Sequence, residues 1–290
     1  MAPARRPTGL TDHREPAGSG AEGRRAPGNP ALVELLRSEI ERQGRITFAR
    51  FMSLALYHPE HGYYVRSADR PTRAGDFLTA PETHPLFGHA LGRQLDEMWR
   101  LLDQPRPFTL REYGPGTGSL AEAVLDGLRA DRSALLDAIR YEPLDVAPAR
   151  AAEISDRLAA GGFGGVPAAP DPGAAVTGCV LANELLDALP VHRVTVLGGQ
   201  LRELYVAWRD GWFADETGEP STEALAGYLE RAGVRLRDGQ QAEVNLAAVD
   251  WIADVAQRLA RGYLLVIDYG HPAGELYGPR RLRGTLMAYR

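Results

Sequence analysis

The segment Leu110-Arg-Glu-Tyr-Gly-Pro-Gly-Thr-Gly-Ser-Leu120 decides the fold, because a short apolar run ends there in a glycine-rich turn and passes into a helical pattern. The spacing is Glu112-x-Gly114-x-Gly116-x-Gly118. Glycines allow a sharp turn and let the backbone approach a ligand that a Cβ atom would push away. The N-terminus of the following helix adds free amide donors for an anion. The segment therefore predicts a strand, a turn and a helix that cradle a nucleotide, with an ordinary glycine-rich connection as the alternative.

The carboxylate at the start of this motif indicates which nucleotide fits. A dinucleotide fold requires G-x-G-x-x-G with an acidic residue about 20 positions later. Here the sixth position is Ser119, and Glu112 stands at the strand end. A carboxylate beside the turn repels a pyrophosphate but suits the cationic amino-acid end of S-adenosylmethionine. We therefore expect this cofactor to contact Glu112 and the glycines at 114, 116 and 118.

Composition excludes several classes of protein. The chain has 290 residues, 44% of them hydrophobic, so it can bury a substantial core and is most simply one large domain with appendages. A net charge of -5 argues against a general nucleic-acid binder. All 33 basic residues are arginine, which excludes a Schiff-base lysine and a P-loop lysine.

Location follows from two further observations. The single cysteine, Cys179, rules out an intramolecular disulfide and favours a reducing compartment. No signal-peptide core is seen, and no apolar run approaches the roughly 18 residues of a membrane span. We expect a cytoplasmic protein without a membrane partner.

Three regions are expected along the chain. Residues 1–29 lack periodic apolar residues and predict a disordered tail, and residues 30–107 predict a helical cap with a turn-rich loop. Residues 108–290 alternate apolar strands with amphipathic helices, which is typical of a doubly wound α/β sheet. Within it, β-rich segments at about 191–245 predict an inserted antiparallel element. Strands are expected at 108–113, 139–144, 177–182 and 263–267, with a short one hidden before 177, and helices at 85–102, 119–130, 147–160 and 246–260.

Polar side chains follow several of these strands, and ligands of open α/β sheets bind at the carboxyl ends of the strands. Glu142 ends the strand after the glycine turn, where a carboxylate can accept both ribose hydroxyl protons; a solvated charge is the alternative. Asn183, Glu184 and Asp187 follow the next strand and bring an amide and two carboxylates towards the same cleft, where we expect Asn183 to contact the cofactor; Glu184 would also suit a helix N-terminus. Asp268 follows the last strand.

A metal site is not expected. The histidine pairs His58 with His61 and His84 with His89 both lack a third ligand at a suitable spacing.

Four segments taken together resemble the MidA family of S-adenosylmethionine-dependent class I methyltransferases. They are Gly75–Glu82 followed by Phe87-Gly88, Glu112–Gly118, Ala182–Pro190 and Ile267–Gly270, and they occur in the order and spacing of that family. The likeness covers roughly residues 31–290. It implies a Rossmann-like class I methyltransferase sheet with an N-terminal helical cap. Because the mitochondrial member of the family is an arginine methyltransferase acting in complex I assembly, it also implies a protein arginine as acceptor.

The resemblance also implies roles for particular residues. The cap would carry the substrate loop, with Gly75 beside the cofactor. A guanidinium is permanently protonated at neutral pH, so carboxylates must hold it and accept a proton as the methyl group arrives. The candidates for this catalytic role are Asp76, Glu82, Glu184 and Asp187.

One departure from the family concerns the C-terminus. The family continues beyond the position of Asp268 with two more strands, whereas this chain stops at Arg290. In the usual strand order 3-2-1-4-5-7-6, the strand at 263–267 would then be an exposed apolar edge, which proteins avoid. We expect the later residues or a partner, such as a second copy in a homodimer, to cover it.

Two other functions stay open. The chain could be a small-molecule O- or N-methyltransferase, for which a hydroxyl acceptor would want a neutral base such as His192 or His61. It could also be a non-catalytic assembly protein that keeps the methyltransferase fold. An NAD(P) oxidoreductase is disfavoured because Ser119 breaks the dinucleotide spacing.

Overall fold

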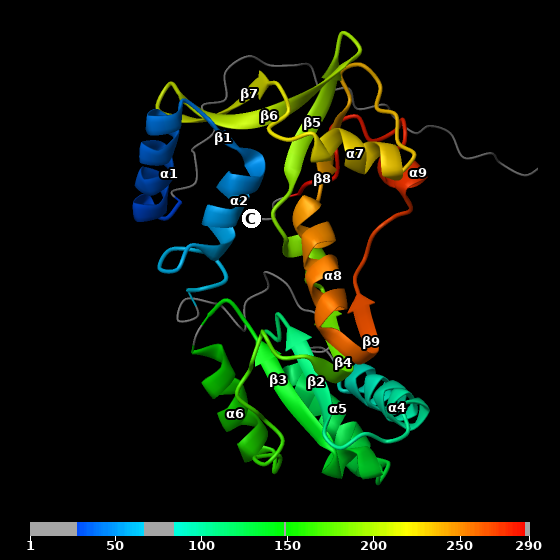
Figure 1. The fold of residues 1–290 in the computed structure, drawn as a ribbon. Helices are drawn as coiled ribbons and strands as arrows, with labels where there is room; N and C mark the ends of the chain where they lie inside the picture. Colours follow the sequence, from blue (N-terminus) through cyan, green and yellow to red (C-terminus); the bar gives the residue numbers. More distant parts are fainter. Residues whose placement is uncertain (1–27, 67–83, 148, 288–290) are drawn as a thin grey trace, which may run out of the picture.

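The computed structural model describes residues 28–66, 84–147 and 149–287. Two sheets organise these residues: a parallel sheet of four strands and an antiparallel sheet of five (Figure 1). The expected tail up to residue 27 lies outside the described residues, and so does the whole of the segment 75–82.

The parallel sheet contains β2 (Phe108–Tyr113), β3 (Ile139–Leu144), β4 (Val176–Asn183) and β9 (Leu259–Ile267) in the order β3-β2-β4-β9. In the connection where a short strand is expected before residue 177, the structure has only an isolated parallel bridge, which joins Tyr141 of β3 to Pro167. The bounds of β2 and β3 are those predicted from the sequence. The doubly wound class I architecture is therefore confirmed by the order of these strands and by their parallel pairing.

Helices cover both faces of the parallel sheet. The larger core lies between one face and three helices, α4 (Leu86–Leu101), α5 (Ser119–Ala130) and α6 (Arg150–Ala160). On the opposite face Val180 packs against Val255 of α8 (Leu246–Arg258). Because successive strand residues point to opposite faces, β4 serves both cores: Cys179 and Leu181 face the larger core, and Val180 faces α8. A 3₁₀ helix, Ala134–Asp137, links α5 to β3.

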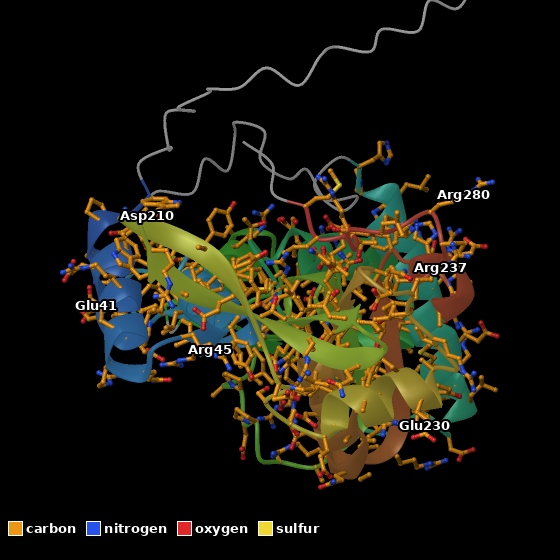
Figure 2. All side chains as sticks on the ribbon, turned by 90° about the horizontal axis from the view of Figure 1, so that it is seen from above. Glu41, Arg45, Asp210, Glu230, Arg237 and Arg280 are labelled. Atoms are coloured by element: carbon orange, nitrogen blue, oxygen red, sulfur yellow. The ribbon has the colours of Figure 1, made fainter. Side chains whose placement is uncertain are left out.

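The inserted antiparallel element occupies the predicted residues and is joined by a strand from the N-terminal part of the chain. It comprises β5 (His192–Leu197), β6 (Gln200–Arg209), β7 (Trp212–Gly218) and β8 (Gln241–Val244), and the short strand β1 (Ile46–Thr47) pairs with β6. Helices α1 (Pro30–Gln43) and α2 (Phe48–Tyr57) pack with Val206 of β6, while α7 (Ala224–Arg231) packs with Val194 of β5. Seen from above, Asp210 of the β6–β7 hairpin and Glu41 of α1 lie on one side of the molecule and Arg237 and Arg280 on the other (Figure 2).

The expected cap at residues 30–107 does not pack as one unit. Helices α1 and α2 join the antiparallel sheet, whereas Leu95 and Trp99 of α4 lie in the core of the parallel sheet beside Leu125 of α5. The reason is the apolar side of α4, which is wide enough to bury Gly88 and Gly92 directly against α5. Helix α4 is thus part of the parallel layer.

The chain after β9 crosses to the antiparallel sheet. A short helix, α9 (Ala273–Leu276), precedes a segment that Gln240 holds through the Tyr277 carbonyl at 3.0 Å. Gln241 forms a parallel bridge with Arg283, and Thr285 donates its N–H to Glu243 at 2.8 Å. In the described residues β9 is therefore an edge strand, and the residues that follow it support β8 instead. The homodimer expected at this edge stays a prediction.

No helix within the described ranges is long and apolar enough to cross a membrane.

Candidate functional site

The glycine turn lies at the carboxyl end of β2, as its spacing predicts. All three glycines have left-handed φ angles: +66° at Gly114, +56° at Gly116 and +77° at Gly118. A Cβ atom on Gly118 would lie 2.9 Å from Ile154, and one on Gly114 would lie 3.1 Å from Leu185, so protein atoms fill the space there. Among the residues that the structure describes, a Cβ atom on Gly116 would meet nothing within 4 Å. Gly116 is thus the glycine that opens onto free space above the turn, where a ligand can approach the backbone.

Glu112 is 2% exposed and lies on the face of β2 that also carries Leu110. Its Oε2 atom accepts a hydrogen bond of 2.6 Å from the hydroxyl of Tyr141. Burial raises the pKa of the Glu112 carboxyl to about 7, although the bond from Tyr141 opposes the rise. A cation beside this carboxyl would favour its ionised form.

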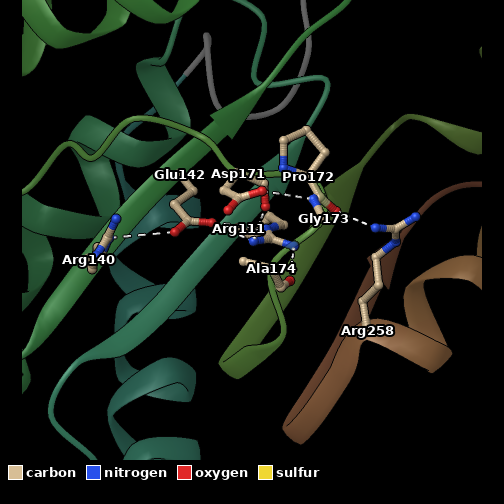
Figure 3. Close-up of polar contacts among 8 residues, drawn as sticks. All are labelled: Arg111, Arg140, Glu142, Asp171, Pro172, Gly173, Ala174 and Arg258. Atoms are coloured by element: carbon tan, nitrogen blue, oxygen red, sulfur yellow. Dashed lines mark hydrogen bonds and ion pairs between the residues drawn. The ribbon is translucent and has the colours of Figure 1, made fainter.

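Glu142 lies in an ion pair inside the protein. Two nitrogens of Arg111, Nε and Nη2, donate to its Oε2 atom at 3.0 and 2.8 Å, and both side chains are almost fully buried (Figure 3). Arg111 also donates to the carbonyls of Asp171 at 2.7 Å and Ala174 at 3.0 Å. Glu142 thus neutralises the charge of Arg111, the residue that holds the loop before β4 through these two carbonyls. The ribose role expected for it stays a prediction.

A second carboxylate, missed in the sequence, lies closer to the turn. Leu144 is opposite Tyr113 in the sheet, and its carbonyl accepts the Gly114 N–H at 2.9 Å. The next residue, Asp145, is therefore the first beyond the strand and lies beside the glycine turn. Its Oδ1 atom accepts the Ala147 N–H at 2.8 Å. The sequence could have indicated Asp145, because it is the first residue after the predicted strand that ends at Leu144.

The turn after β4 is held from several sides. Glu184 has a φ of +50°, which is rare outside glycine, and donates its N–H to the Ile267 carbonyl at 2.8 Å. Asp268 accepts the Leu186 N–H at 2.9 Å, at the start of the 3₁₀ helix Leu186–Ala188. The hydroxyl of Tyr269 donates to the carboxylate of Asp187, whose side chain is exposed.

Two carbonyls of the same turn are held from elsewhere in the chain. Asn245, the cap of α8, donates its amide to the Leu186 carbonyl at 2.9 Å. Tyr57, the last residue of α2, donates its hydroxyl to the Ala188 carbonyl at 2.7 Å. Backbone held in a sparsely populated conformation by many contacts is a feature of functional sites.

Besides burial, the charges of Asp145, beside the glycine turn, and of Asp187, in the turn after β4, both raise the pKa of Tyr57. Burial, then Tyr64, then the charges of Asp187 and Asp145 raise the pKa of the Tyr57 hydroxyl. Burial and then the charge of Asp187 raise the pKa of Asp268. Asp145, Asp187 and Asp268 therefore gather around one end of the parallel sheet, as expected for residues at the carboxyl ends of neighbouring strands.

Other candidates lie elsewhere or are not described. Gly75, Asp76 and Glu82 fall in the segment outside the described residues. Asn183 is the last residue of β4 and pairs with Ile267. The rings of His58 and His61 stack at 5.0 Å, and within the described part of the chain no group of three or more His, Cys, Asp or Glu residues could hold a metal ion.

Known proteins share this architecture. Residues 90–290 match the family described as "Putative S-adenosyl-L-methionine-dependent methyltransferase". The mitochondrial protein arginine methyltransferase NDUFAF7 homolog of Drosophila melanogaster is 30% identical over 274 residues, which cover 84% of this chain and 61% of that protein. The mitochondrial protein arginine methyltransferase NDUFAF7 of Danio rerio is 26% identical, over 84% of this chain and 63% of its own length.

A solved structure from Burkholderia thailandensis, bound to S-adenosyl-homocysteine, superposes with a TM-score of 0.77 at 33% identity. The match covers 88% of this chain and 66% of that one. The chain thus spans slightly under two thirds of the length of these relatives.

Proposed function

Because this chain belongs to the S-adenosyl-L-methionine-dependent methyltransferase family that the match over residues 90–290 defines, we propose that it binds S-adenosylmethionine and methylates a protein arginine. The family match bears out the resemblance to MidA proteins. The observation that carries the proposal is the open turn at Gly116, which follows β2 between the ends of β3 and β4, the strands that precede Asp145 and Asp187.

The residues around the turn fit this cofactor. When bound, the cofactor supplies an electrophilic methyl group on a sulfonium. The backbone at Gly116 leaves room for the ligand, and the buried carboxyl of Glu112 suits a cationic amino group. A ribose needs a carboxylate at the strand end, and Asp145 is nearer to the turn than Glu142, which already compensates Arg111. We assign the ribose to Asp145.

The turn after β4 supplies carboxylates for the acceptor. A guanidinium needs carboxylates to hold it and to offset its permanent charge. Asp187 is exposed, and only one of its oxygens, Oδ2, accepts the hydroxyl of Tyr269. Glu184 lies in the same turn. The choice of arginine is supported by the names of the two relatives above, which are protein arginine methyltransferases. The expected cytoplasmic location stays a prediction.

The test begins with cofactor binding. Calorimetry with S-adenosylhomocysteine should give binding to the parent protein and little to Gly116→Ala, since the added methyl group occupies the free space above the turn. Gly198→Ala is the matched control, because Gly198 in the β5–β6 turn has a φ of +59° and equally open surroundings. Equal binding by both variants would contradict the site.

The acceptor is tested with cofactor carrying a labelled methyl group. The parent protein is incubated with cell-extract proteins, and the labelled products are hydrolysed to amino acids. Labelled methylarginine supports the proposal. Label found only in small molecules would favour a metabolite methyltransferase, and cofactor binding without any labelled product would favour a non-catalytic assembly protein.

A further inference from the structure

A carboxylate and a histidine form a buried pair in the antiparallel sheet. Glu203 of β6 is 0% exposed. Its Oε1 atom lies 2.8 Å from Nδ1 of His192, and its Oε2 atom accepts the Ser221 N–H at 2.6 Å. Burial opposes ionisation, but the bonds from His192 and Ser221 lower the pKa of Glu203 below its usual value. The pair therefore has a fixed geometry with an ionised carboxylate.

Apolar side chains lie on the same face of the sheet as Glu203. It is opposite Val194 in the sheet, and residues directly opposite one another share a face. On that face Val194 packs with Leu225 and Leu229 of α7. An ionised group in such surroundings costs several kcal/mol of desolvation unless it is well paired, and an apolar residue of similar volume is often no less stable. Stability alone is thus a poor account of a carboxylate at this position.

The carboxylate determines the state of the imidazole. An ionised Glu203 can only accept, so Nδ1 of His192 carries the proton between them, and in the neutral imidazole Nε2 then holds the lone pair. Within the described residues Nε2 has no hydrogen-bond partner. The buried side-chain nitrogens and oxygens without a partner in the described residues are Nε of Arg150 and Nε1 of Trp251. Since Nε2 of His192 has no partner and is not one of these buried atoms, it is open to solvent. His192 thus offers an accessible proton acceptor whose orientation is fixed.

His192 lies at the junction of the two layers. It is the first residue of β5, and this end of the strand lies towards the carboxyl ends of the parallel strands (Figure 1). Its partner across the sheet is Val244, and the next residue, Asn245, donates its amide to the Leu186 carbonyl. His192 therefore begins the strand that follows the turn carrying Glu184 and Asp187.

We propose that His192 takes up the proton that the methyl acceptor releases, and that Glu203 is the residue that positions it. This inference rests on the proposed methyl transfer. The acceptor nitrogen forms a bond to the methyl carbon, and the electron pair of the broken carbon–sulfur bond stays on sulfur. The N–H proton passes to Nε2 of His192 and from there to water. An imidazole oriented by a carboxylate is a common arrangement for a general base.

The decisive variant is His192→Asn. The Asn amide keeps an N–H donor near the position of Nδ1, so Glu203 stays paired and the protein should melt as the parent does. Affinity for S-adenosylhomocysteine should change less than about twofold, while methyl transfer falls about 100-fold, the lower end of what general bases contribute. His271→Asn is the control, because Nδ1 of His271 also faces a carboxylate, Glu275 at 3.4 Å, but in an exposed pair.

A second measurement does not depend on activity. Nitrogen NMR of the imidazoles should show His192 protonated at Nδ1 and not at Nε2 in the parent protein. Glu203→Gln should abolish that preference, and Glu203→Asp should restore part of it. Because Glu203→Gln also places an amide against the Ser221 N–H, its stability is measured alongside. A parent protein protonated at Nε2 would overturn the positioning role.

The remaining outcomes separate the two proposals. If the parent labels extract proteins and His192→Asn does so at the parent rate, the proton role is wrong and the methyltransferase stands. If the parent labels nothing, the proposed function fails and the proton role fails with it. A loss of transfer that tracks a loss of cofactor affinity would make His192 a binding residue and overturn this inference.

Discussion

Replacing Glu112 by Gln should stabilise the protein at neutral and alkaline pH while weakening its site. Burial raises the pKa of this carboxyl from 4.5 to about 7. One pKa unit corresponds to about 1.4 kcal/mol, so keeping the group charged in the folded state costs roughly 3 kcal/mol. Gln keeps a carbonyl oxygen for the Tyr141 hydroxyl but has no charge to desolvate.

The sign of the pH dependence follows from where each state loses its proton. Below the unfolded pKa of 4.5 both states are protonated, and the carboxyl costs nothing. Between 4.5 and about 7 the unfolded chain releases its proton first, so the free energy of unfolding falls as pH rises. Above that range the cost is constant. The gain from Glu112→Gln should therefore be absent near pH 4 and complete near pH 8.

Thermal melts of both proteins across this pH range measure the effect. For a chain of this size a gain of about 3 kcal/mol raises the melting temperature by roughly 5 to 10 °C. Glu230→Gln, which removes an exposed carboxylate from α7, should follow the parent curve. Affinity for S-adenosylmethionine should fall by about 1.5 to 3 kcal/mol, because a charged contact to its amino group is lost. A gain that is equal at pH 4 and pH 8 would refute the buried-charge reasoning.

Two further predictions use matched variants. Glu184→Gly and Asp210→Gly each relieve a φ of +50°, so the free energy of unfolding should stay level or rise by up to about 1 kcal/mol in both variants. Only Glu184→Gly should lose methyl transfer. Equal activities of the two variants would show that Glu184 is not in the acceptor site. Asp145→Ala should weaken S-adenosylhomocysteine binding by about 1.5 to 3 kcal/mol in a stable protein, whereas Glu142→Ala should cost about 3 to 5 kcal/mol of stability by leaving Arg111 buried without its partner. A stable Glu142→Ala that binds poorly would return the ribose to Glu142.

The parts of the fold that the sequence predicts are those that depend on local patterns. Strand β2, the turn and helix α5 occupy the predicted residues because a strand, three glycines and a helical apolar period follow one another without a gap. The sequence places the helix at 85–102 in the cap, whereas the structure packs α4 against α5 of the parallel layer. Its place against α5 depends on Gly88 and Gly92, whose close approach a linear pattern does not reveal.

The candidate site shows the same limit at the level of single residues. The sequence places Glu142 at a strand end, but the sheet register puts Arg111 directly opposite it. Parallel register depends on tertiary packing and cannot be counted along the chain. The His192–Glu203 pair, in contrast, had a readable signal. The two-residue turn at Gly198-Gly199 pairs Leu197 with Gln200, and counting back along both strands places Glu203 opposite Val194.

The turn after β4 connects the two layers of the molecule. Strand β9 of the parallel layer supplies Asp268, which binds the Leu186 N–H. Tyr57, at the end of α2, and Asn245, which directly follows β8 of the antiparallel sheet, bind its carbonyls. The positions of Glu184 and Asp187 therefore depend on how the two layers meet. Such a turn holds its carboxylates in place before a ligand arrives, which lowers the cost of ordering them at the moment of reaction. The antiparallel element thus helps to shape the proposed acceptor side of the site, while the proposed cofactor side depends on the parallel sheet.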